Sequence, residues 1–124
     1  MKITIKSFRN GKNTENKLKR LYTSAFPAEE RAPFRLMMSR VKTGKGEMLA
    51  AFDGDEFVGF AYIICHEDVA YLFYLAVEES KRGMGYGSFI IAGVKKKYHG
   101  KRIFLAREQL DESAPNYSQR VSRR

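Results

Sequence analysis

One short run of residues has the composition of an anion site: Arg-Gly-Met-Gly-Tyr-Gly at residues 82–87, between an apolar stretch and a segment with helical periodicity. The first N–H groups of a helix have no partner within the helix and carry partial positive charge, so they favour an anion. Glycines let the backbone approach that anion and permit positive φ angles. Lys81 and Arg82 add positive charge. We therefore expect residues 82–88 to bind a phosphate or pyrophosphate group.

A nicotinamide dinucleotide is the first alternative ligand. Its fingerprint, Gly-x-Gly-x-x-Gly, follows a strand of a parallel sheet. Here the third glycine, Gly87, comes one position early, and Ser88 stands where the fingerprint requires glycine. The strand before the run also ends an antiparallel meander. We therefore exclude a nicotinamide dinucleotide.

The elements that must position this run are predicted from hydrophobic periodicity and turn residues. In chain order we expect a strand, two amphipathic helices, three antiparallel strands, a helix and a further strand, over residues 2–8, 14–26, 32–42, 47–52, 56–65, 69–78, 85–98 and 102–108. Asp53-Gly54 is a favoured type I′ pair and predicts the first hairpin of the meander. The last strand–helix–strand passage implies parallel pairing.

The strand over residues 69–78 is apolar on both faces, which predicts a position inside a sheet that is covered on both sides. Strict alternation places Leu72, Tyr74 and Ala76 on one face. The other face then carries Tyr71, Phe73, Leu75 and Val77.

Residues 82–87 match the Arg/Gln-x-x-Gly-x-Gly/Ala signature of the GCN5-related N-acetyltransferase (GNAT) superfamily. The stretch YLFYLAVEES resembles the central strand of that family, and GYGSFIIAGVKKKY resembles the helix after it. The resemblance implies an α/β (α+β) fold with a mixed, mainly antiparallel central sheet flanked by helices. It covers a single domain over residues 1–124. The last two strands of the family are missing, so we expect a C-terminally shortened domain and a homodimer that covers the open sheet edge.

The resemblance also implies acetyl-coenzyme A (acetyl-CoA) as cosubstrate. The implied contacts are strand main chain to pantetheine, loop amides to pyrophosphate, and an asparagine near the pantetheine arm. The corresponding residues are Leu75, Ala76, Val77, Arg82, Gly83, Met84, Gly85, Tyr86, Gly87, Ser88 and Asn116.

Acetylation of an amine requires alignment with the thioester, a base for the ammonium proton and an acid for the leaving thiolate. Relatives often use a carboxylate and a tyrosine. The candidates here are Glu108 and Tyr74, although Glu108 equally fits a surface carboxylate and Tyr74 a core side chain. Glu29 and Glu30, between the first two helices, either attract a cationic amine or favour the start of the second helix through its dipole.

The composition limits the other partners. A single cysteine, Cys65, permits no intrachain disulfide, and no Cys/His spacing indicates a metal. No apolar run reaches the roughly 18 residues of a membrane span, and the N-terminus lacks the apolar centre of a signal peptide, so we expect a cytoplasmic protein. The net charge of +9 attracts polyphosphates, nucleic acid or acidic surfaces.

Three functions remain open. The leading hypothesis is an acetyl-CoA-dependent N-acetyltransferase that modifies a primary amine of a small molecule or peptide. The second is a non-catalytic CoA-binding or regulatory module, favoured by the short C-terminus. The third is a nucleic-acid-binding domain, which the charge favours, but aromatic and basic residues are not interleaved in any one strand.

Overall fold

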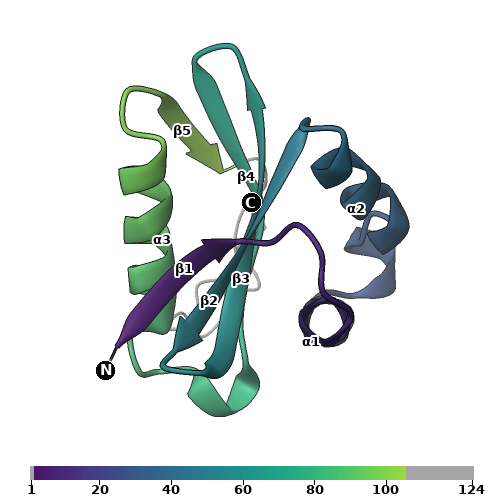
Figure 1. Ribbon diagram of the computed structural model, residues 1–124, viewed down its shortest axis with the longest axis vertical. Helices are drawn as coiled ribbons and strands as arrows, with labels where there is room; N and C mark the ends of the chain where they lie inside the picture. The colour runs from purple at the N-terminus through teal and green to yellow at the C-terminus, as the bar shows by residue number, and fades with distance from the viewer. Residues whose placement is uncertain (1, 106–124) are drawn as a thin grey trace.

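A computed structural model describes residues 2–105 of the 124-residue chain. One five-stranded sheet, in the order β1-β2-β3-β4-β5, lies between helices on its two faces (Figure 1). The elements are β1 (Ile3–Ser7), α1 (Lys12–Ala25), η1 (Ala28–Glu30), α2 (Phe34–Lys42), β2 (Gly46–Asp53), β3 (Glu56–His66), β4 (Val69–Val77), η2 (Glu79–Lys81), α3 (Tyr86–Lys97) and β5 (Arg102–Leu105). Neighbouring strands are antiparallel except β4 and β5, which are parallel. The predicted fold class is confirmed.

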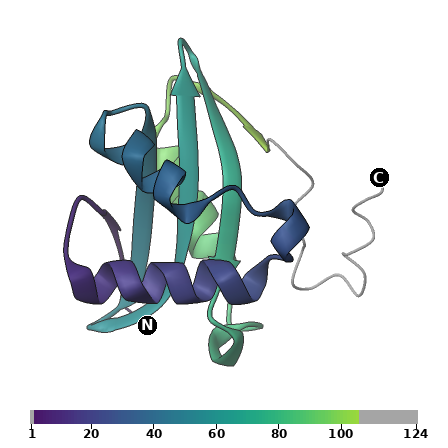
Figure 2. The ribbon, with the colours of Figure 1, turned by 90° about the vertical axis from the view of Figure 1, so that its right-hand side faces the viewer.

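Helices α1 and α2 cover one face of the sheet, and α3 covers the other (Figures 1 and 2). On the first face, the buried stripes of α1 and α2 pack against the central strand β3 at Phe60 and Tyr62. On the second face, Ile90 and Val94 of α3 pack with Val58 of β3. Each helix therefore forms because its apolar stripe recurs at helical spacing and has a sheet face to cover. None of the helices within residues 2–105 is long and apolar enough to cross a membrane.

The first turn of the meander differs from the predicted type I′ turn. Asp53 still belongs to β2 and pairs with Glu56, so Gly54 and Asp55 form the two-residue loop. Gly54 has a φ of 65°, whereas among the described non-glycine residues only Glu67 has a positive φ. A type I′ turn requires positive φ at both central positions, so the type I′ prediction is wrong.

Strict alternation along β4 is also wrong. Tyr62 pairs with Tyr74 but the next residue, Ile63, pairs with Leu72, so Phe73 is an extra residue that forms a β-bulge. The bulge resets the alternation. As a result Tyr74 packs with the α1 and α2 cluster while Leu72 packs with the α3 cluster, although the sequence pattern places both on one face.

Gly59 of β3 lies in close contact with β4 and with α3. A Cβ added there would lie 2.5 Å from the carbonyl oxygen of Ala76 and 3.0 Å from Ile90 Cδ1. We expect Gly59→Ala to lower the free energy of unfolding by about 2 kcal/mol, because the backbone carbonyl cannot move aside. Chemical denaturation measures this loss.

Gly93→Ala is the matched control. Its Cβ would meet only the side chain of Ile5, at 3.0 Å, and alanine favours the helix by about 1 kcal/mol. Its cost should therefore be clearly smaller than that of Gly59→Ala, and equal costs would contradict the packing described here.

Candidate functional site

The glycine run forms the link between β4 and α3. After β4 ends at Val77, the chain makes the short η2 turn and reaches Gly83 and Gly85, whose φ angles are 82° and 88°. Gly85 caps α3 in the left-handed conformation. The Phe89 N–H bonds the Gly85 carbonyl at 3.2 Å as the first i→i−4 bond of the helix. The amides before Phe89 in the first turn therefore have no such partner, which is the arrangement that favours an anion at the start of a helix.

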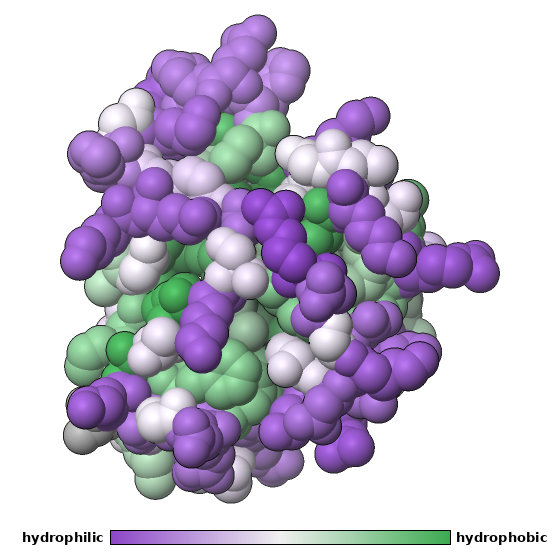
Figure 3. Space-filling view, viewed as in Figure 1, coloured by the Kyte–Doolittle hydropathy of each residue, from purple (hydrophilic) through white to green (hydrophobic). Residues whose placement is uncertain are grey.

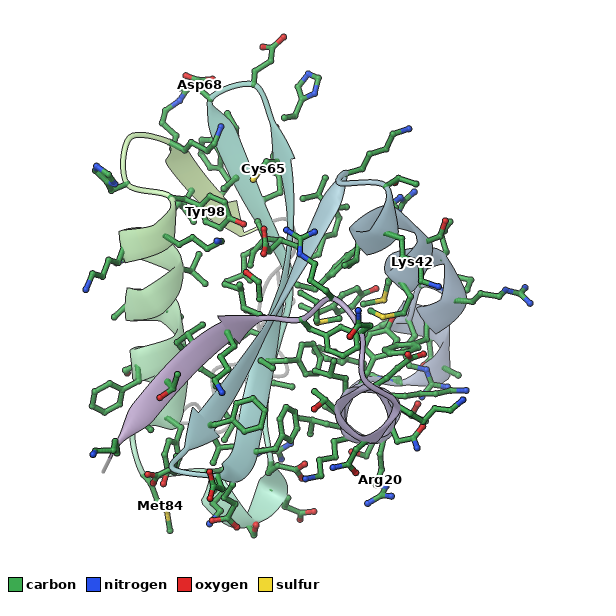
Figure 4. The ribbon with its side chains drawn as sticks, viewed as in Figure 1. Arg20, Lys42, Cys65, Asp68, Met84 and Tyr98 are labelled. Atoms are coloured by element: carbon green, nitrogen blue, oxygen red, sulfur yellow. The ribbon has the colours of Figure 1, made fainter. Side chains whose placement is uncertain are left out.

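Two side chains of the run, those of Met84 and Tyr86, have different surroundings. Met84 is 53% exposed and extends from the bottom of the molecule in Figure 4. Tyr86 instead is buried, and its hydroxyl donates a 2.5 Å hydrogen bond to Asp53 Oδ2 at the end of β2. The Lys2 N–H donates to the other oxygen, Asp53 Oδ1, at 2.9 Å. The hydrogen bond from Tyr86 lowers the pKa of Asp53, and the same bond raises the pKa of the Tyr86 phenol.

A second contact ties the loop to the same hairpin. Lys81 Nζ lies 2.9 Å from Glu56 Oε1, at the start of β3. The β2–β3 hairpin thus holds the glycine loop on both sides, through Tyr86 and through Lys81. Sequence reasoning treated Asp53 only as a turn residue and did not single out Glu56, because contacts between distant segments leave no local pattern.

The two basic side chains expected at the anion site are already engaged. Lys81 forms the ion pair with Glu56, and Arg82 Nε donates to the Val77 carbonyl at 3.0 Å. The Arg82 side chain therefore bonds the last carbonyl of β4. Its guanidinium has further N–H donors, and the residue is exposed, so it can still add positive charge beside the loop.

Near the loop, the N–H and C=O groups of successive β4 residues face alternately towards β3 and away from it. Glu78 N–H bonds the Val58 carbonyl in β3 at 2.8 Å, and the Ala76 carbonyl also faces β3, towards Gly59. Alternation therefore turns the main-chain groups of Leu75 and Val77 away from β3. Parallel pairing with β5 covers Val69–Leu72, so within residues 2–105 no strand pairs with this side of Leu75–Val77. The main-chain groups of Leu75 and Val77, unlike those of Ala76, therefore lie on the side of β4 that no described strand covers.

The other predicted site residues lie apart from the loop. Tyr74 is buried, accepts a hydrogen bond from the Ala32 N–H at 3.1 Å and donates one to the Glu30 carbonyl at 3.0 Å. It thus fixes the segment between α1 and α2 to the sheet. The side chains of Glu29 and Glu30 are exposed on that segment. Glu108 and Asn116 lie outside the described residues. Within residues 2–105 no cluster of acidic, histidine and cysteine side chains could hold a metal ion.

This combination of a meander, a glycine loop at a helix start and a strand that is open on one side is the arrangement of the GNAT fold. The Acetyltransferase (GNAT) family matches residues 15–120, and the chain belongs to this family. No curated protein matches the chain.

Solved structures agree with this assignment. An aminoglycoside 6′-N-acetyltransferase complexed with coenzyme A is 25% identical with a TM-score of 0.66, over 77% of this chain and 55% of its own. The chain thus spans about half the length of that enzyme. An aminoglycoside acetyltransferase from an uncultured soil metagenomic sample, in complex with sisomicin, is 17% identical with a TM-score of 0.67, over 98% of this chain and 85% of its own. A Bacillus subtilis acetyltransferase in complex with CoA is 20% identical with a TM-score of 0.61, over 79% of this chain and 59% of its own. The last two show the fold alone.

The Tyr86–Asp53 contact should give a pH-dependent stability. The pKa of Asp53 lies below its ordinary value of about 3.9, so the contribution of this carboxylate is present above that pH and is lost as the pH falls through the lower folded value. The pKa of Tyr86 lies above about 10, so the contribution of the phenol is present below that pH and is lost as the pH rises through the higher folded value.

We therefore expect Tyr86→Phe to lower the melting temperature most between about pH 5 and pH 9, with a smaller difference from the parent protein at either extreme. Thermal melts across this pH range measure the difference. Tyr71→Phe, at the other end of β4, is the control. A Tyr86→Phe effect of constant size at every pH would contradict the assigned contact.

Proposed function

We propose that this protein binds acetyl-CoA and transfers the acetyl group to a primary amine. The observation that carries the proposal is the run of main-chain N–H groups from Gly83 to Ser88, at the start of α3 and beside the outward-facing edge of β4. A bulky diphosphate needs an approach that side chains do not block, and a Cβ at Gly83 or Gly85 would meet nothing within 4 Å. Coenzyme A in the structure of the 25% identical aminoglycoside 6′-N-acetyltransferase supports the choice of ligand.

The loop and the strand bind different parts of this ligand. The amides of residues 83–88 hold the diphosphate, and Arg82 adds positive charge beside it. The main-chain N–H and C=O of Leu75 and the N–H of Val77 pair with the pantetheine amides as a further strand would, while the Val77 carbonyl already accepts from Arg82 Nε. This pairing directs the ligand along β4, away from the loop and towards the bulge at Phe73. The net charge of +9 adds long-range attraction for a polyphosphate.

When bound, acetyl-CoA supplies a thioester carbonyl that a neutral amine can attack. Alignment of the two groups supplies most of the required catalysis, since the proton transfers need only a positioned acid and base. Glu108 follows β5 in the chain and remains our candidate for the base. We assign Tyr74 to the positioning of the loop between α1 and α2, because its hydroxyl already bonds Ala32 and Glu30.

We further propose a cationic amine as the acceptor. Glu29 and Glu30 are exposed in the η1 segment, which Tyr74 fixes to β4 through the Glu30 carbonyl. Their carboxylates form a local negative site on a strongly basic protein. The 25% identical structure is that of an aminoglycoside 6′-N-acetyltransferase, which supports a polyamine class of acceptor.

Gly85→Val tests the placement of the diphosphate. Valine at a φ of 88° strains the loop and projects into the open space in front of the amides, so we expect acetyl-CoA affinity to fall about 100-fold, equivalent to about 3 kcal/mol. Titration calorimetry of both proteins with acetyl-CoA measures the change.

Gly44→Val is the matched control. Gly44 has a φ of 82° and nothing within 4 Å of an added Cβ, but it lies between α2 and β2. It should carry a similar strain and leave acetyl-CoA binding unchanged. Normal binding by folded Gly85→Val would contradict the placement.

Release of free thiol from acetyl-CoA, with aminoglycosides, polyamines and peptides as acceptors, tests the transfer reaction. We expect release with cationic amines, and a loss of at least about tenfold in kcat/KM when Glu29 and Glu30 are both replaced by glutamine. Binding without release from any acceptor would assign the chain to the non-catalytic CoA-binding class.

A further inference from the structure

A groove lies between the edge strand β1 and helix α3, separate from the β4 edge and the glycine loop. Its cavity volume is about 600 Å³. Apolar side chains dominate it and lysines lie along one end; the lining residues are Ile3, Ile5, Ser7, Leu49, Phe89, Ala92, Gly93, Lys96 and Lys97. Figure 3 shows apolar surface at the lower left, where β1 and α3 lie in the same view of Figure 1, among hydrophilic side chains.

The main chain of β1 is open on the side of this groove. Phe8 N–H bonds the Met48 carbonyl at 2.7 Å, and Gly54 N–H bonds the Lys2 carbonyl at 3.0 Å, so the even-numbered positions of this segment face β2. Alternation turns the N–H and C=O groups of Ile3, Ile5 and Ser7 outward. β1 is the edge of the sheet, and within residues 2–105 no other strand pairs with it there. An added strand could therefore bond to β1.

The facing wall of α3 offers an apolar surface to such a strand. Phe89 is 48% exposed and lies one turn before Gly93. A Cβ at Gly93 would lie 3.0 Å from Ile5 Cγ1, so the helix comes close to the strand and leaves Phe89 beside the open edge. Alternate side chains of an added strand would lie against Ile3, Ile5 and Phe89.

The positive charge beside the groove favours a partner with acidic residues. The lining contains Lys96 and Lys97 and no acidic residue. Lys97 Nζ lies 4.0 Å from Glu47 Oε2, whereas Lys96 forms no ion pair within residues 2–105. The opposite face of β1 carries Lys2 and Lys6. A second copy of β1 would bring two more lysines to this edge, so a partner with acidic residues fits better.

We propose that β1 and α3 bind an extended acidic segment of a partner protein by strand addition. The segment bonds to the outward main-chain groups of β1 and places apolar side chains in the groove. Its alternate side chains lie on the opposite face and direct carboxylates to Lys2 and Lys6, and a carboxylate at the groove-facing end of the segment reaches Lys96 and Lys97. A nucleic acid would match the lysines, but it has no ladder of amide groups for β1 and no apolar side chains for the groove. The proposal does not depend on acetyl-CoA binding.

The test uses eight-residue synthetic peptides in which valine alternates with glutamate, except that the first and last groove-facing positions also carry glutamate, and a control series with lysine in place of glutamate. Titration calorimetry with the full chain should show binding of the acidic peptide only. A third peptide, N-methylated at alternate amides, cannot donate the ladder bonds and should bind at least about tenfold more weakly.

Variants locate the site. Lys96→Glu should weaken the acidic peptide about tenfold, whereas Lys95→Glu, on the same helix but outside the groove lining, should change affinity by less than about threefold. Ser7→Pro removes an outward N–H from an exposed residue and should weaken binding while the fold is retained.

Several results would overturn the proposal: no binding of the acidic peptide, equal binding of the lysine peptide, equal effects of the two lysine variants, or binding of an oligonucleotide that competes at Lys96. Melting curves with acetyl-CoA show whether each variant is folded and keep this outcome separate from that of the proposed function.

Discussion

Two positive φ angles, at Gly83 and Gly85, are the constraint on which the candidate site depends. They let the chain leave β4 and enter α3 with its first amides exposed, and they keep side chains out of the approach to those amides. Every other feature of the site follows from this geometry. The start of α3 presents the amides that we propose as the anion site, and the outward edge of Leu75 and Val77 lies directly before it in the chain.

The rest of the fold supports this short loop. The β2–β3 hairpin holds it through Tyr86–Asp53 and Lys81–Glu56, so the stability of the meander and the conformation of the loop are coupled. Arg82 closes the end of β4 from within the loop. The loop is thus preorganised by contacts to the sheet, which reduces the entropy that a bound diphosphate must overcome.

Local sequence patterns predicted the helices and strands. The features that the sequence did not predict arise from contacts between segments that are distant in the chain. The stripes of Leu18 and Leu21 in α1, and of Ile90 and Val94 in α3, have a clear helical period and were found. The glycine run was found because its residue types are themselves unusual. The bulge at Phe73 was missed because it arises from the register between β3 and β4, which alternation alone does not encode. Asp53 was seen only as a turn residue, since its bond to Tyr86 joins segments 33 residues apart.

The most direct test of the central claim is amide NMR during a titration with acetyl-CoA. Diphosphate binding by the main chain predicts the largest shifts at the amides of residues 83–88, with smaller shifts at Leu75 and Val77. Shifts confined to other parts of the molecule, or none with folded protein and excess ligand, would contradict it.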